Sequence, residues 1–150
     1  MDHELRTFTL EEANRLIPTV TQLLLQLKEK QKHVIDLEPQ IDALELILDR
    51  TSAESSKELN HLIEIHRARV TEFYSAVDQI HQLGCLLKDV ELGLIDFYAV
   101  LNGKVVYLCW KLGEEKVAFW HEVGQGYAYR EPIDLNHPHD GKPDDKEMGV

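Results

Sequence analysis

The sequence is poor in cysteine and in long apolar segments. Cys85 and Cys109 are the two cysteines in 150 residues, and they lack the Cys-x-x-Cys spacing of redox and zinc motifs. No apolar stretch approaches the length of a membrane span, and the first residues contain no signal-peptide core. These absences predict a reduced, soluble, cytoplasmic protein that does not enter membranes.

Basic residues are also scarce. The chain has 16 Lys and Arg residues against 27 Asp and Glu residues, so its formal net charge is −11. A surface of this charge repels nucleic-acid phosphates and anionic lipids, and we expect neither as a partner. The sequence also lacks a phosphate-binding glycine loop, a nucleophile elbow, an EF-hand loop and a dinucleotide fingerprint. It therefore favours no reaction class with a readable signature.

A helical pattern fills the first two thirds of the chain. Thr9 and Glu12 form a Thr-x-x-Glu capping box, which predicts a helix start near Leu10. Apolar residues then recur at alternating spacings of three and four as far as Leu48, with Lys30 as the one interruption. Such a seam is typical of a coiled coil, and it predicts one long helix that needs a partner.

Two prolines lie inside this pattern. Pro18 and Pro39 each remove a helical hydrogen bond, yet the apolar phase continues through both. The sequence therefore predicts a kinked first helix, although Pro39 leaves two separate helices open as an alternative.

A second apolar stripe runs from Leu59 to Ile80, and Gly84 is well placed to end the helix that carries it. The small polar run at residues 51–56 supplies caps and a connecting loop. Two long helices with facing stripes predict an antiparallel helical hairpin over about residues 10–83.

After Gly84 the apolar period changes from 3.6 to 2, which is typical of strands. Asn102-Gly103 is a strong hairpin signal, and Gly113-Glu114 offers a second reversal. We expect three antiparallel strands, Leu94–Leu101, Lys104–Leu112 and Glu115–Glu122.

The predicted fold is therefore α+β, with a three-stranded antiparallel meander within about residues 86–122 packed on the helical hairpin. Residues 1–133 are expected to form a single domain. Residues 134–150 are polar and lack periodicity, so they are expected to form a flexible, disordered acidic tail.

Two-residue loops at both turns would assign a face to every strand residue. The core face would then carry Ile95, Phe97, Ala99, Val106, Leu108, Trp110, Val117, Phe119 and His121. The other face, called the mixed face below, would carry Asp96, Tyr98, Val100, Val105, Tyr107, Cys109, Ala118, Trp120 and Glu122. An exposed aromatic row beside carboxylates indicates a contact surface. The alternative is that Tyr127, Arg130 and the C-terminal segment fold back and cover it.

The strand residues offer little support for metal or thiol chemistry. A metal site could use Asp96, Glu114, His121 and Glu122, but alternation sends His121 and Glu122 to opposite faces. Cys109 near Asp96 is expected to be a packing thiol, because a neighbouring carboxylate disfavours the thiolate. The sequence therefore assigns no metal ligands and names no cofactor.

Several short stretches carry a resemblance to a known family. They are Phe8-Thr9-Leu10-Glu11-Glu12-Ala13-Asn14, Gly93-Leu94-Ile95-Asp96-Phe97, Leu108-Cys109-Trp110, Gly113-Glu114, Trp120-His121-Glu122, and Gly126 with Arg130 and Pro132. In these stretches the chain resembles a small prokaryotic family known as domain of unknown function 2203, from Thr7 to about Ile133. The resemblance implies no activity. It implies only that the signature residues lie in the strand region, namely Asp96, Cys109, Trp110, Glu114, Trp120, His121, Glu122 and Arg130.

Two functional hypotheses follow. The first is a non-enzymatic interaction or structural module that self-associates as a homodimer through its helices or its mixed face. The second is a small-ligand or metal-dependent enzyme on the mixed face, in which Arg130 holds an anionic group. The candidate ligand-binding residues are Asp96, Tyr98, Tyr107, Cys109, Glu114, Trp120, His121, Glu122 and Arg130.

Overall fold

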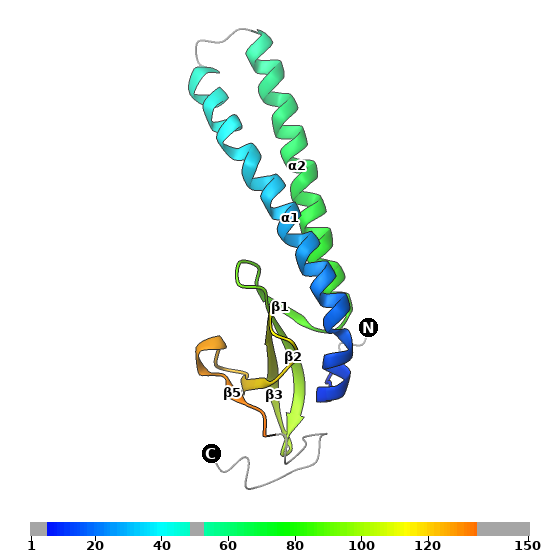
Figure 1. The fold of residues 1–150 in the computed structure, drawn as a ribbon. Helices are drawn as coiled ribbons and strands as arrows, with labels where there is room; N and C mark the ends of the chain where they lie inside the picture. The colour runs from blue at the N-terminus through cyan, green and yellow to red at the C-terminus, as the bar shows by residue number, and fades with distance from the viewer. Residues whose placement is uncertain (1–5, 49–52, 135–150) are drawn as a thin grey trace. The chain divides into compact units, whose positions relative to one another are not determined.

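The computed structural model of the chain describes residues 6–48 and 53–134. Two helices precede an antiparallel sheet (Figure 1): α1 (Leu10–Leu48), α2 (Ala53–Gln82), β1 (Leu86–Asp89), β2 (Leu94–Leu101), β3 (Lys104–Lys111), β4 (Phe119–Glu122), the 3-10 helix η1 (Tyr127–Tyr129) and β5 (Glu131–Pro132). The predicted α+β class and helical hairpin are confirmed. The sheet has five strands rather than the predicted three. From residue 135 onward, the predicted tail lies outside the described residues.

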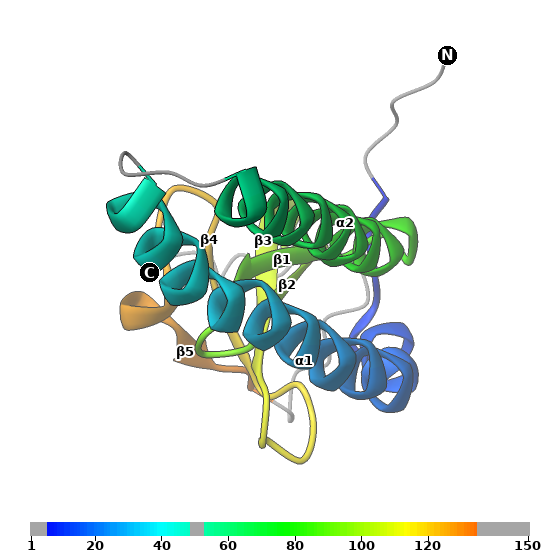
Figure 2. The same cartoon turned by 90° about the horizontal axis from the view of Figure 1, so that it is seen from above.

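The chain forms two compact units. One combines the chain up to Leu24 with the chain from Ile80 onward, and the other is Leu25–Gln79. In the second unit, stretches of α1 and α2 lie side by side (Figure 1 and Figure 2). Its described residues include three buried apolar side chains, those of Leu27, Leu59 and Ala76.

The local signals at the start of α1 act as predicted. Thr9 N donates to Glu12 Oε1 at 2.9 Å, and Glu12 N donates to Thr9 Oγ1 at 3.0 Å. In this capping box, the backbone N–H of each residue is satisfied by the side chain of the other, where the helix begins at Leu10. The helix then continues without interruption through Pro18 and Pro39, so the alternative of two separate helices is wrong.

The sheet has the strand order β1-β2-β3-β4-β5, and every neighbouring pair is antiparallel. Its core face centres on Phe97, whose ring meets the ring of Phe8 edge-on at 5.2 Å. Phe8 N also donates to Tyr98 O at 2.7 Å, which ties the segment before α1 to β2. Leu108 and Trp110 are buried beside Phe97 on neighbouring positions of β3.

The first predicted turn sets the β2–β3 register correctly. Asn102 and Gly103 have φ values of 53° and 80°, as a tight hairpin turn requires. Leu101 therefore pairs with Lys104, Asp96 pairs with Cys109, and Tyr98 pairs with Tyr107.

The second predicted turn is wrong by one residue, and the third predicted strand is too long. The chain reverses at Leu112-Gly113, where Glu114 N donates to Lys111 O at 2.9 Å. It does not pair with β3 immediately, and Val117 N instead donates to Asn14 Oδ1 of α1 at 2.7 Å. Strand β4 therefore begins at Phe119 rather than at Glu115.

Because of this difference in register, each side chain of β4 lies on the face opposite to the predicted one. Phe119 pairs with Cys109 and His121 pairs with Tyr107, whereas Trp120 pairs with Leu108. Side chains of directly paired residues share a face of the sheet. Phe119 and His121 thus belong to the mixed face, and Trp120 and Glu122 belong to the core face, the opposite of the prediction.

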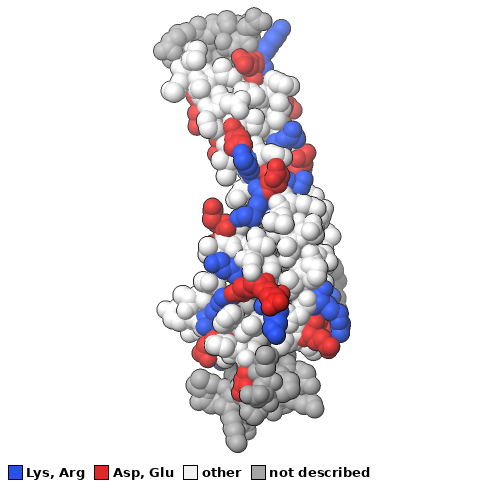
Figure 3. All heavy atoms as spheres, viewed as in Figure 1, with Lys and Arg blue, Asp and Glu red and all other residues white. Residues whose placement is uncertain are grey.

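Charged side chains of both signs are interspersed on the visible face of the described residues (Figure 3). The described helices include none that is long and apolar enough to cross a membrane.

Candidate metal centre

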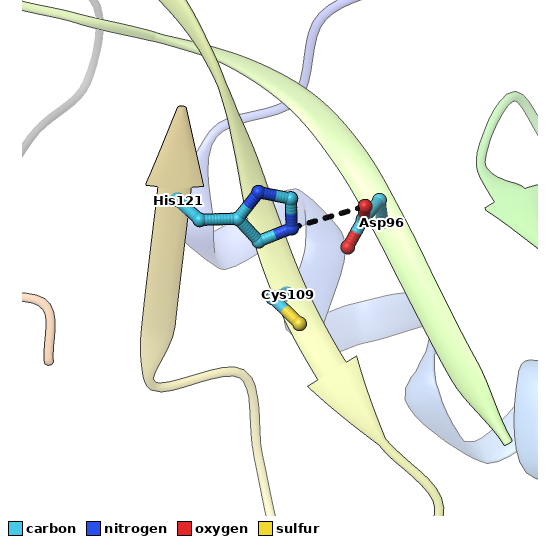
Figure 4. Close-up of side chains that lie close together, drawn as sticks. All are labelled: Asp96, Cys109 and His121. Atoms are coloured by element: carbon cyan, nitrogen blue, oxygen red, sulfur yellow. Dashed lines mark hydrogen bonds and ion pairs between the residues drawn. The ribbon is translucent and has the colours of Figure 1, made fainter. Parts of the chain in front are cut away.

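Three side chains from three adjacent strands meet on the mixed face (Figure 4). Asp96 comes from β2, Cys109 from its paired position on β3, and His121 from β4. Their exposed fractions are 2%, 1% and 3%. One potential ligand atom from each residue lies within 4.8 Å of the other two. A carboxylate, a thiol and an imidazole are therefore gathered in a site shielded from water.

Both ring nitrogens of His121 have partners. Nδ1 lies 2.9 Å from the backbone carbonyl of Glu122, and Nε2 lies 3.1 Å from Asp96 Oδ2. A carbonyl oxygen can only accept a hydrogen bond, so Nδ1 carries the hydrogen. The Nε2–Oδ2 contact then holds one proton, shared by the imidazole and the carboxyl group. This arrangement aims Nε2 into the site.

Asp96 has spare ligand capacity. Its Oδ1 atom is buried and has no hydrogen-bond partner among the described residues. Burial raises the pKa of the Asp96 carboxyl above its ordinary value, and the neighbouring His121 ring opposes that rise only in part. A buried carboxylate oxygen without a hydrogen-bond partner is available to a bound cation.

Cys109 is not arranged as a nucleophile. Burial, reinforced by the negative charge of Asp96, raises the pKa of its thiol to about 12. The two His121 nitrogens are occupied by Glu122 and Asp96, so neither is placed to deprotonate Cys109. The geometry therefore does not support thiol catalysis, whereas a metal ion would stabilise the thiolate directly.

The donor set suits a zinc-like ion. Zinc accepts cysteine sulfur at about 2.3 Å and histidine nitrogen or carboxylate oxygen at about 2.0–2.2 Å, so tetrahedral ligand atoms lie roughly 3.3–3.8 Å apart. Asp96 Oδ2 and His121 Nε2, at 3.1 Å, are already near that separation. Cys109 supplies the third donor atom, which lies within 4.8 Å of a ligand atom of each of the other two residues.

A small cavity adjoins the three side chains. Its volume is about 120 Å³, and its walls include Lys88, Leu94, Gln125, Gly126 and Tyr127 together with the three potential ligands.

The segment after β4 covers the neighbouring part of the mixed face. The Arg130 guanidinium stacks over the ring of Phe119 at 4.0 Å and over the ring of Tyr127 at 4.4 Å. It forms a two-point ion pair with Glu114, and its Nη1 atom lies 3.8 Å from Cys109 Sγ. Arg130 is thus engaged by the protein itself, as the alternative of a folded-back C-terminal segment expected.

The other predicted site residues are divided between the faces. Tyr98 and Tyr107 lie beside the centre on the mixed face, and their hydroxyl groups are hydrogen-bonded at 3.1 Å. Trp120 and Glu122 lie on the opposite face, where Glu122 forms an ion pair with Lys104 at 3.0 Å. Neither belongs to the cluster.

Sequence reasoning missed Lys88, Gln125, Gly126 and Phe119 as site residues. Lys88 lies on β1, a strand that the sequence did not predict, and the sequence placed Phe119 on the wrong face of the sheet. The positive φ of Gly93, at 71°, marks the reversal between β1 and β2, so the Gly93 signal could have revealed β1.

Residues 6–133 match a family model described as "Uncharacterized conserved protein (DUF2203)". No curated protein and no solved structure matches the chain.

Proposed function

Because the chain belongs to the DUF2203 family, whose description names no activity, we propose from the geometry alone that it binds one zinc-like metal ion through Asp96, Cys109 and His121. The observation that carries this proposal is the orientation of His121. Its Nδ1 hydrogen is committed to the Glu122 carbonyl, which leaves Nε2 as the donor atom that faces the other two ligands. Metal-binding histidines in proteins are oriented in this way by a carbonyl or carboxylate partner.

Metal binding would displace protons from the site. One is the proton shared by Asp96 and His121, and the other is the proton of the Cys109 thiol, whose pKa of about 12 keeps it in place at neutral pH. The affinity for zinc should therefore rise with pH, by between ten-fold and 100-fold per pH unit according to whether one or both protons remain. A surface site that uses only exposed carboxylates would not show this dependence near neutral pH.

Isothermal titration of the untagged, chelator-treated full chain with Zn²⁺ tests the proposal. We expect one ion per chain, and a loss of affinity of about 100-fold or more in Cys109→Ser and in Asp96→Asn. Cys85→Ser is the matched control for the thiol, because Cys85 is equally buried but lies outside the cluster. Glu122→Gln is the control for the carboxylate, because Glu122 lies on the opposite face.

Zn²⁺ binding that is equally strong in Cys109→Ser and Cys85→Ser would contradict the proposed metal site. His137 and His139 are separated in sequence by Pro138 alone, and a pair of histidines can also bind Zn²⁺. A double His137→Ala, His139→Ala variant should therefore accompany the titration. Retention of the single strong site in that variant separates the cluster from the C-terminal histidines.

A second function, self-association, is favoured by the unit Leu25–Gln79. Its buried apolar residues are few, and large apolar side chains are exposed on it: Leu25, Ile35, Leu46, Ile47 and Tyr74, at 50–77% exposure. A helical hairpin with so small a core gains stability when a second hairpin covers its apolar surface, as in a four-helix bundle. The expected partner is a second copy of this chain.

Sedimentation velocity over a range of concentrations tests this second proposal. We expect a dimer for the unmodified chain and a monomer for Ile35→Glu, since a charge at a buried interface is costly. Leu92→Glu is the control, because Leu92 is exposed to a similar degree but lies in the β1–β2 turn. A monomer at every concentration, or dissociation of the dimer by both variants alike, would contradict self-association through the hairpin.

A further inference from the structure

The cavity beside the cluster indicates which ligand the metal would take. Three protein ligands leave a four-coordinate ion with one open position, which in proteins is filled by water or by a small molecule. The described cavity is lined by the three potential ligands and by Lys88, Leu94, Gln125, Gly126 and Tyr127. The chemistry of these residues therefore restricts what can occupy that position.

With a divalent metal bound, the formal charges at the site sum to +1, and Lys88 accounts for this charge. A divalent ion is neutralised by the Asp96 carboxylate and the Cys109 thiolate, while His121 contributes no charge. Arg130 forms a two-point ion pair with Glu114, so its charge is also compensated. Lys88 is the one cation among the described residues that line the cavity, and no carboxylate other than Asp96 lines it. The loaded site thus carries one excess positive charge.

The backbone places Lys88 at this cavity. The pairing of β1 with β2 shifts between Leu87 and Asp89, so Lys88 lies at a bulge. Bulges redirect side chains, and they occur frequently next to functional sites. The Lys88 ammonium lies 4.6 Å from the centre of the Tyr107 ring, and Tyr107 pairs with His121 on the mixed face. Lys88 therefore extends over the face that carries the cluster.

The size of the cavity limits the ligand further. A cavity of about 150 Å³ accommodates benzene in a well-characterised engineered protein, and this one has a volume of about 120 Å³. The space beside the metal position is therefore sufficient for a group of about four to six non-hydrogen atoms.

Building on the proposed metal centre, we infer that the open metal position takes a small oxyanion with a single carboxylate or phosphate group, and that Lys88 supplies its counter-charge. A divalent metal with its three ligands is neutral, so the Lys88 ammonium is left as the positive charge beside the cavity. Lys88 is a binding residue in this account and is not a metal ligand.

Cobalt-substituted protein allows the two proposals to be tested separately. Co²⁺ occupies zinc sites, and its visible absorption changes when its ligands change. The full chain loaded with Co²⁺ is titrated with acetate, and then with acetamide, which has nearly the same size and no charge. We expect a saturable spectral change with acetate and a much weaker response to acetamide.

Lys88→Met should weaken acetate binding about ten-fold, because it removes one charge at contact range from a partly hydrated site. The affinity for Co²⁺ itself should change far less, since Lys88 is not among the ligands. Lys116→Met is the matched control, because Lys116 is exposed and does not line the cavity.

The possible failures are distinguishable. If Co²⁺ binds through the cluster but acetate leaves the spectrum unchanged, the anion inference is overturned and the metal centre remains. The same conclusion follows if acetamide binds as well as acetate, or if Lys88→Met binds acetate as tightly as Lys116→Met. If Co²⁺ does not bind to the cluster, both proposals are overturned.

Discussion

The Nε2 atom of His121 lies 3.1 Å from Asp96 Oδ2, and each side chain is only 3% exposed. The two residues are 25 positions apart in sequence and come from strands that flank β3. Since the other nitrogen of His121 donates to the Glu122 carbonyl, this contact holds a single proton between two groups that both bind metal ions well. In the proposed metal site, a bound cation would replace this proton.

Asp96→Asn should gain stability relative to the unmodified, metal-free protein as the pH rises. Burial raises the pKa of the Asp96 carboxyl in the folded state above its ordinary value of 3.8. The folded protein therefore binds this proton more tightly than the unfolded chain does. The stability that results is fully present below pH 3.8, and it is lost as the pH rises through the folded-state pKa. Asparagine cannot ionise, so the variant escapes this loss.

Urea unfolding at several pH values, with chelator present, measures the effect. The difference in unfolding free energy between Asp96→Asn and the unmodified chain should shift in favour of the variant as the pH rises, because only the carboxyl group of the unmodified chain can ionise. Asp42→Asn, on the exposed surface of α1, reports the effect of removing a charge alone. An advantage that is constant or declines with rising pH would contradict the account of Asp96.

Both thiols should be protected in the folded protein. Cys85 and Cys109 are each 1% exposed, and burial raises their pKa values to about 11 and about 12, from 9.0. Iodoacetamide at pH 8 should label them at least ~100-fold more slowly than in urea, since labelling requires opening of the structure. Mass spectrometry of timed samples gives the two rates, and rapid labelling of native Cys109 would show that it is accessible.

Arg130→Ala should lower the free energy of unfolding, and its main effect should not be on ligand binding. The Arg130 side chain is 12% exposed, pairs with Glu114, and stacks on Phe119 and Tyr127. Its removal leaves a partly buried carboxylate without its partner, and we expect a loss of about 2–4 kcal/mol in the free energy of unfolding.

The control for Arg130 is Arg67→Ala. Arg67 pairs with Glu64 on the surface of α2, where both side chains are about 70% exposed, and such pairs contribute within about 0.5 kcal/mol. Denaturant unfolding compares the two variants. If Arg130→Ala unfolds like the unmodified chain, Arg130 does not secure the segment after β4.

Gly93→Ala should be the most damaging of three glycine substitutions. Gly93 has a φ of 71°, and a Cβ atom there would lie 2.6 Å from Leu112 Cβ. Positive φ costs about 1–2 kcal/mol for a non-glycine residue, and the clash adds to it, so we expect a loss of about 2–4 kcal/mol. Leu112 N donates to Gly93 O, so the clash also disturbs the β3 end of the sheet.

Two other glycines separate these causes. Gly113 has a φ of 104° with no atom within 4 Å of the added Cβ, so Gly113→Ala should show only the backbone cost. Gly124 has neither feature, and Gly124→Ala should stay within about 0.5 kcal/mol of the unmodified chain. Thermal unfolding of the three variants gives the order, and equal effects at Gly93 and Gly113 would rule out the Leu112 clash.

Short-range features were predictable from the sequence. The capping box formed by Thr9 and Glu12 sets the start of α1, and Asn102-Gly103 sets the β2–β3 hairpin. That hairpin alone brings Asp96 opposite Cys109. Each of these outcomes depends on residues within a few positions of one another, whose backbone preferences act without the rest of the fold. Strands β1 and β5, with four and two residues, were too short to give a comparable pattern.

The third member of the cluster was decided by the tertiary structure. Asn14 accepts a hydrogen bond from Val117 N across 103 residues of sequence, and this contact replaces the pairing that a two-residue loop would give. The pairing shifts by one residue, and because side chains alternate along a strand, that single step moves His121 from the core face to the face of Asp96 and Cys109. The local sequence thus determines the pairing of Asp96 with Cys109, whereas the register that adds His121 to them is accompanied by a contact with the distant helix α1.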